Sequence, residues 1–215
     1  MTLHAQHVFE TPLIVSDLDG AAAILSALLR SARERQRQSP SDVGRPWSTD
    51  RRMLRWAGEP AVQLLHACVA LADRFTADID APAGRTRYGW SADLRASFPG
   101  SERRIGPDCF PSAFWSVLAV ASEAPSEVKI VINDPLGPLL EMEDPGLRFR
   151  AGPGAPALQP TYATSLATGR LLMFPAWLMR HADFTDAAEE SALITLNLTA
   201  FLVEPPREAE PRAAH

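Results

Sequence analysis

The chain has 215 residues, of which 46% are hydrophobic and 22% charged, a composition typical of a folded globular protein. Its formal net charge of −5 argues against the concentrated basic surface that nucleic-acid binding needs. No apolar run approaches the roughly 20 residues that cross a bilayer, and the first residues lack the order of an export signal, so we expect a cytoplasmic protein with no nucleic-acid or membrane partner.

The chain contains two cysteines, Cys68 and Cys109. Two are too few for a disulfide framework or for a zinc site built from four thiolates. We therefore expect both to be reduced thiols.

The first part of the chain predicts a strand and two helices. β-branched and aromatic residues over 8–18 predict the strand, and Asp17 and Asp19 at its end are residue types that favour a helix N-cap. Apolar residues at helical spacing then predict a helix to about Gln36. A second helix is predicted over 59–78 by the same spacing.

The second part of the chain predicts a sheet. Four runs rich in apolar and β-branched residues predict strands at 114–121, 127–134, 169–175 and 191–203. In the last run, alternate residues from Ala192 to Leu202 should share one face. Two helices followed by several strands predict an α+β fold in which helices support a β-sandwich or jelly roll.

These elements predict one domain and a tail. The domain covers 1–203, with helical support at about 17–80 and a β core at about 84–203. Charged, proline-rich residues at 204–215 predict a disordered tail.

Six short motifs occur in order along nearly the whole chain. They are F-x-T-P (9–12), a Ser–Gly–Trp–Ser loop (41–48), P-x-x-x-P-x-A-F-W-S (107–116), D-P-x-G (134–137), G-x-L-x-x-F-P-x-W-L (169–178) and S-x-x-I-x-x-N (191–197). Together they resemble the signatures of a small bacterial family of 2-oxoglutarate/Fe(II) oxygenases. The resemblance implies a double-stranded β-helix, which is a jelly-roll or cupin-like core, buttressed by N-terminal helices. It also implies a dioxygenase that uses non-haem iron.

The positions that the resemblance assigns to metal ligands are substituted. Such enzymes usually hold iron with two imidazoles and a carboxylate. The resemblance places imidazoles at Asp108, Phe110 and Arg180, and a phenyl ring cannot coordinate a metal. His181 comes one residue later, where a strand turns its side chain to the opposite face unless a bulge re-aims it. If a metal binds, the candidate ligands are therefore Asp108 and His181.

The expected co-substrate contact is also altered. The family's arginine for the 2-oxoglutarate carboxylate falls on Ser191, which cannot make that charge-assisted contact. Arg170, Arg180 and Lys129 remain candidates for binding the co-substrate or another anion. The candidates for lining a pocket are Trp90, Phe114, Trp115, Trp177 and Asn197.

Two classes of function stay open, and no catalytic residue is assigned. The first is a pseudoenzyme without a cofactor, which binds a small molecule or peptide or pairs with a partner protein. The second is an active, divergent dioxygenase that uses Fe(II) or another metal, with 2-oxoglutarate, to hydroxylate a peptide or natural product. The substituted ligand positions favour the first. Exposed strand edges are compatible with a homodimer or a heterodimer.

Overall fold

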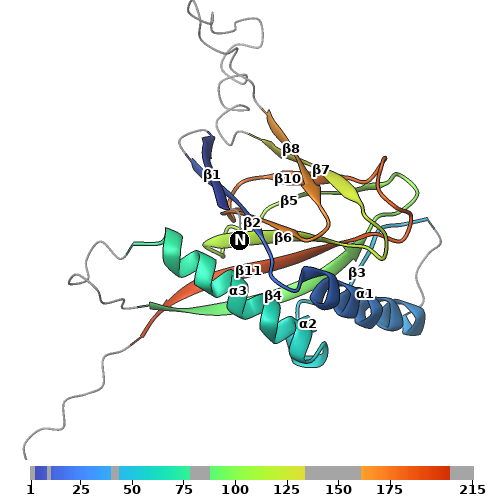
Figure 1. The fold of residues 1–215 in the computed structure, drawn as a ribbon, viewed down its shortest axis with the longest axis horizontal. Helices are drawn as coiled ribbons and strands as arrows, with labels where there is room; N and C mark the ends of the chain where they lie inside the picture. Colours follow the sequence, from blue (N-terminus) through green and yellow to red (C-terminus); the bar gives the residue numbers. More distant parts are fainter. Residues whose placement is uncertain (1–2, 9–10, 40–43, 78–87, 134–160, 204–215) are drawn as a thin grey trace, which may run out of the picture.

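The computed structural model describes residues 3–8, 11–39, 44–77, 88–133 and 161–203 (Figure 1). The helices are α1 (Ala21–Gln38), α2 (Met53–Trp56) and α3 (Glu59–Phe75). The strands are β1 (Leu3–Val8), β2 (Thr11–Asp17), β3 (Trp47–Ser48), β4 (Tyr88–Phe98), β5 (Arg104–Asp108), β6 (Trp115–Ala121), β7 (Glu127–Asn133), β8 (Thr161–Ala167), β9 (Arg170–Pro175), β10 (Arg180–Asp183) and β11 (Ala192–Leu202).

The strands form two antiparallel sheets that pack face to face, as in a β-sandwich. The seven-stranded sheet has the order β1-β2-β9-β6-β11-β4-β3, and the four-stranded sheet has the order β5-β10-β7-β8. From β4 to β11 the chain passes repeatedly between the two sheets, as it does in a jelly roll. Figure 1 shows the helices on the outer side of the larger sheet.

Both predicted helices are confirmed, as α1 and α3, but the predicted cap is wrong. Gly20, not Asp17 or Asp19, is the N-cap of α1, and it makes no side-chain cap bond. The chain turns directly from β2 into the helix through a left-handed residue with φ +70°, a conformation that glycine adopts without steric cost. No helix in the described ranges is long and apolar enough to cross a membrane.

The four predicted strands are confirmed as β6, β7, β9 and β11, and the alternation in β11 sorts its side chains between two apolar layers. Ala192, Ile194, Leu196 and Leu198 are buried in the layer between the seven-stranded sheet and the helices. Leu193 is buried instead in the layer between the two sheets. Beyond Leu198 the predicted face is not covered, since Leu202 is exposed. The predicted tail at 204–215 lies outside the described residues.

Candidate functional site

The interior of the sandwich is apolar toward one end and polar toward the other. The apolar part includes Leu118 and Leu193 from the larger sheet and Ile130 from the smaller one. Toward the polar end, β11 places Thr195 and then Asn197 on the same inner face as Leu193. The side chains at the polar end are therefore buried hydrogen-bonding groups, and such groups need partners.

Asp108, Phe110 and Arg180, the substituted ligand positions, lie together at this polar end. Arg180 of β10 pairs across the strands with Asp108 of β5. Phe110 follows β5, and its backbone N–H donates to the carbonyl of Ala176, 2.8 Å away. The guanidinium carbon of Arg180 lies 5.6 Å from the centre of the Phe110 ring and 5.9 Å from that of Phe174. A cation thus lies among the residues that the resemblance assigns to iron.

Arg180 is buried without a full set of hydrogen-bond partners. Its residue is only 1% exposed, and neither terminal guanidinium nitrogen has a partner among the described residues. Burial lowers the pKa of Arg180 from its ordinary value to about 10, with Asp108 opposing and Arg95 reinforcing that change. Arginine is rarely buried unless it is paired, so this side chain is an unusual feature of the interior.

Two further arginines face the same ring. The guanidinium carbons of Arg95 and Arg51 lie 4.6 and 5.4 Å from the centre of the Phe110 ring. Arg95 also donates a hydrogen bond to Asp108, and the side chains of this pair are 17% and 30% exposed. We call Arg51, Arg95, Asp108, Phe110 and Arg180 the arginine cluster. The exposure of Asp108 means that solvent reaches one side of it.

A short chain of hydrogen bonds lies beside the cluster and includes Asn197, one of the predicted pocket residues. Ser116 donates to the amide oxygen of Asn197 at 3.0 Å, and the Asn197 amide nitrogen donates to Asp93 at 3.0 Å. The neighbouring hydroxyl of Thr195 is buried and has no partner among the described residues. These bonds fix Asn197 in the interior of the sandwich.

His181 lies on the other side of the four-stranded sheet from Arg180. It is a half-buried residue paired with Val131, while its neighbours Arg180 and Ala182 are buried. The pairing of β10 with β5 has a register shift opposite His181. The extra residue lies in β5, so the His181 side chain keeps the direction that regular alternation along β10 gives it. Asp108 and His181 therefore do not converge. Within the described ranges, no three His, Cys, Asp or Glu side chains are grouped to hold a metal.

Two of the three predicted anion-binding cations lie outside the cluster. Arg170 is 55% exposed, and its Nε is 3.6 Å from an Asp17 carboxylate oxygen. Lys129 is an exposed residue of β7. Ser191, at the position of the family's arginine, lies with its hydroxyl 3.0 Å from that of Ser126. Only Arg180 of these three cations joins the arginine cluster.

Replacing His181 with glutamine should make the melting temperature less dependent on pH. Burial, then Arg104, lowers the pKa of His181 below its ordinary value of 6.5. The unfolded chain therefore binds the proton more readily, and wild-type stability falls as the pH drops through 6.5 toward the folded-state pKa. Melting curves from about pH 8 to about pH 5 should show a small loss that His181→Gln reduces. The exposed His66 gives a matched control, since His66→Gln should leave the loss in place.

The predicted aromatic residues separate into a core residue and an exposed ridge. Trp115 is buried, and its indole N–H donates to Thr76 at 2.9 Å. Phe114 contacts Trp90 and Trp177 with ring centres 6.0 and 6.4 Å apart. Phe114 and Trp177 are 40% and 47% exposed, so these three rings form a ridge at the surface. Ala176 joins the ridge to the cluster, because its N–H donates to Phe114 and its carbonyl accepts from Phe110.

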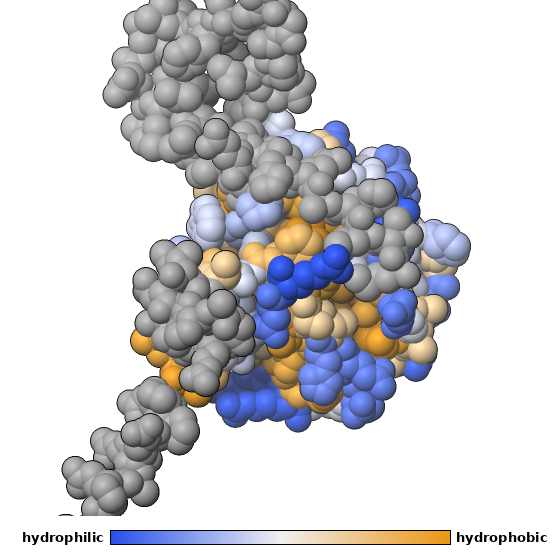
Figure 2. Space-filling view, turned by 60° about the vertical axis from the view of Figure 1, so that its left-hand side comes forward, coloured by the Kyte–Doolittle hydropathy of each residue, from blue (hydrophilic) through white to orange (hydrophobic). Residues whose placement is uncertain are grey.

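Apolar side chains also reach the surface at the end of β11. Phe201, Leu202 and Val203 are all at least half exposed there. Figure 2 shows hydrophobic residues interspersed with hydrophilic ones on one face of the molecule. Nothing in the described residues indicates what would cover them.

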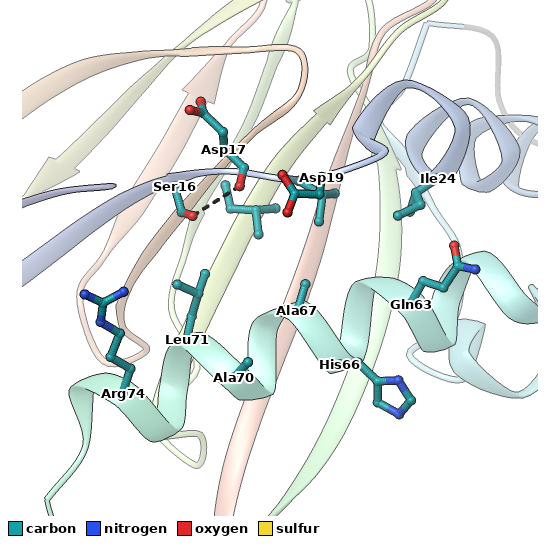
Figure 3. A pocket seen from close by; sticks show the side chains of 12 residues that line it. Ser16, Asp17, Asp19, Ile24, Gln63, His66, Ala67, Ala70, Leu71 and Arg74 are labelled. Carbon is teal, nitrogen blue, oxygen red and sulfur yellow. Dashed lines mark hydrogen bonds between the residues drawn. The ribbon is translucent and has the colours of Figure 1, made fainter. Parts of the chain in front are cut away.

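A pocket of about 550 Å³ lies away from the arginine cluster, on the helical side of the seven-stranded sheet. It is formed between α3 and the connection from β2 to α1 (Figure 3). Its lining includes apolar residues such as Leu71 and exposed polar ones such as His66 and Arg74. Lining residues such as Leu71 and Leu171 are buried but apolar, and the buried hydroxyl of Ser16 already donates to the carbonyl of Asp17, so neither kind of lining group requires a ligand.

No family model and no curated protein matches this sequence. Among solved structures, the chain is similar to a crystal structure of an oxidoreductase of the 2OG-Fe(II) oxygenase family from Burkholderia pseudomallei. The two chains are 9% identical, with a TM-score of 0.40, over 92% of this chain and 72% of the other. An identity and a TM-score this low do not establish membership of that family.

Proposed function

We propose that this chain is a non-catalytic, oxygenase-like protein that binds a small molecule inside its jelly roll, without iron or 2-oxoglutarate chemistry. The observation that carries the proposal is the identity of the residues at the polar end of the sandwich. Asp108, Phe110 and Arg180 meet there, and Arg180 is a buried cation. A double-stranded β-helix is supported by the path of β4 to β11 between the two sheets.

The donor set of the arginine cluster does not fit a divalent metal. A non-haem iron site needs neutral imidazoles and carboxylates that converge on one point. Here one carboxylate, Asp108, already accepts a hydrogen bond from Arg95. A metal ion would also have to approach the positive charge of Arg180, which repels it.

The residues present fit 2-oxoglutarate no better as an oxygenase co-substrate. Its carbonyl and carboxylate oxygens are held by iron in such enzymes, and the cluster lacks the ligands for iron. The remote carboxylate needs an arginine or lysine partner. Ser191 is at that position, and both Arg170 and Lys129 are exposed residues outside the cluster, so Arg180 is the one predicted cation that could bind a carboxylate at the cluster, without iron beside it.

The purified protein should not retain iron. After anaerobic reconstitution with Fe(II) and desalting, we expect elemental analysis to give far less than one iron per chain. Incubation with 2-oxoglutarate and oxygen should then give no succinate above a protein-free control. Stoichiometric iron with 2-oxoglutarate-dependent succinate would contradict the proposal and support the active dioxygenase.

A variant that restores the ligands provides the matched control. Phe110→His with Arg180→His places two imidazoles beside Asp108, which is the ligand set of a non-haem iron centre. We expect this double variant to bind Co(II) with visible absorption bands that the wild-type protein lacks. Equal Co(II) spectra for the two proteins would show that the arginine cluster is not what prevents metal binding.

A further inference from the structure

We propose that the arginine cluster is a binding site for the carboxylate of a small organic acid, with Arg180 as its main contact. This inference rests on the proposed function, because it requires the interior to hold a ligand without a metal. It adds the chemical class of that ligand. The argument begins with the hydrogen bonds that Arg180 lacks.

A buried guanidinium without acceptors is costly, because its N–H groups have lost water and gained nothing in return. Both terminal nitrogens of Arg180 are in this state among the described residues, and so is the Nε of Arg95. The aromatic rings of Phe110 and Phe174 face the charge of Arg180 but are not hydrogen-bond acceptors of ordinary strength. The missing partner is therefore a group with oxygen acceptors.

The charges around the ring of Phe110, where the exposed Arg51 adds to the partly buried Arg95 and the buried Arg180, favour a negative ligand. Three guanidinium groups, those of Arg51, Arg95 and Arg180, surround the ring of Phe110. Asp108 is the one carboxylate of the cluster, and Arg95 is already bound to it. Even when Asp93, held by Asn197, is counted with Asp108, this set keeps an excess of one positive charge. One carboxylate matches that excess, whereas a phosphate carries up to two negative charges.

The surroundings also favour a carboxylate with an apolar body. A guanidinium presents two parallel N–H groups that match the two oxygens of a carboxylate. The rings of Phe110 and Phe174 lie beside Arg180, and the exposed ridge of Phe114 and Trp177 is joined to Phe110 through Ala176. An acid with an aromatic or aliphatic portion would place its charge at Arg180 and its apolar part against these rings.

Titration calorimetry with benzoate, hexanoate and inorganic phosphate tests the assignment, in a buffer containing EDTA. We expect benzoate and hexanoate, each with one carboxylate and an apolar portion, to bind, and benzamide, the neutral analogue of benzoate, to show no heat of binding. Arg180→Met should weaken benzoate binding by about 10- to 100-fold, the value of a charge-assisted hydrogen-bonded contact. Arg51→Met changes an exposed residue and should weaken it by a smaller factor without affecting folding.

Arg170→Met is the matched control, since Arg170 is an exposed arginine outside the cluster, and it should leave benzoate binding unchanged. Binding of phosphate alone, equal binding to wild type and Arg180→Met, or no binding of either acid to folded protein would each overturn the inference. None of these three results would contradict the proposed function, provided that the purified protein also retains no iron. Binding of the acids only after Fe(II) replaces EDTA would instead contradict the proposed function itself.

Discussion

Replacing Arg180 with methionine should raise the stability of the protein in the absence of ligand. Burial lowers the pKa of Arg180 from its ordinary value to about 10, so the cost of the buried charge to the folded state is present at all pH values below about 10. That shift corresponds to about 3 kcal/mol. Loss of ring contacts with Phe110 and Phe174 offsets about 1 to 2 kcal/mol of the gain. Methionine is of similar length and keeps favourable contact with aromatic rings.

We therefore expect a gain of about 1 to 2 kcal/mol in the free energy of unfolding. For a chain of this length the melting temperature should rise by about 2 to 8 °C. Urea denaturation and thermal melts at neutral pH measure both quantities. As a control for an ordinary buried residue, Phe184→Ala should cost about 3 to 5 kcal/mol. A loss of stability in Arg180→Met would mean that the guanidinium is a structural group with partners of its own.

A residue that lowers the stability of the folded protein is typical of a binding site. The higher stability expected for Arg180→Met and its weaker benzoate binding would therefore have the same cause. Core positions evolve toward better packing, whereas a group that serves a ligand is retained despite its cost. One substitution should then both stabilise the fold and weaken the binding. A purely structural arginine would give neither result.

The sequence predicted the elements whose apolar residues follow a regular spacing. α1, α3, β6, β9 and β11 each bury a continuous apolar face, and that face is visible in the sequence. In β6 every residue is buried, and all of them except Ser116 are apolar. These elements form the two apolar layers on which the rest of the fold is built.

Three of the strands that were not predicted carry the polar site, namely β4, β5 and β10. β10 has four residues, of which Arg180 and His181 have little strand preference. β5 contains Gly106 and Pro107, which interrupt a strand pattern. β4 alternates buried Leu94 and Ala96 with polar residues that point into the sandwich, so its inward face does not read as core.

The site itself was only partly accessible to sequence reasoning. The resemblance carried by the motifs implied that Asp108, Phe110 and Arg180, two residues beyond the motif at 169–178, belong together, and the structure brings them together. Arg51 and Arg95 lie outside every motif, and only the pairing of β4 with its neighbours brings them to Phe110. The burial of Arg180 could not be predicted, because an arginine in a sequence is most often exposed.

Replacing Asp108 with asparagine should destabilise the protein by about 2 to 3 kcal/mol. Asp108 accepts a hydrogen bond from Arg95, and its charge also favours the charged form of Arg180. Removing one partner of a buried ion pair leaves the other charge uncompensated, which costs about 3 to 5 kcal/mol when both are fully buried. The 30% exposure of the Asp108 side chain lets water screen part of that cost. Asp186→Asn, at an exposed position, should change stability by less than about 0.5 kcal/mol.

A double-mutant cycle separates the two arginines that Asp108 serves. In an Arg180→Met background, Asp108→Asn leaves one buried guanidinium uncompensated instead of two, so it should cost about 1 kcal/mol less than in the wild-type protein. Urea denaturation of the four proteins gives this coupling energy. Additivity within about 0.3 kcal/mol would show that Asp108 acts through Arg95 alone. Arg180 would then lack any counter-charge within the cluster, and an anionic ligand would be the only group that could supply one there.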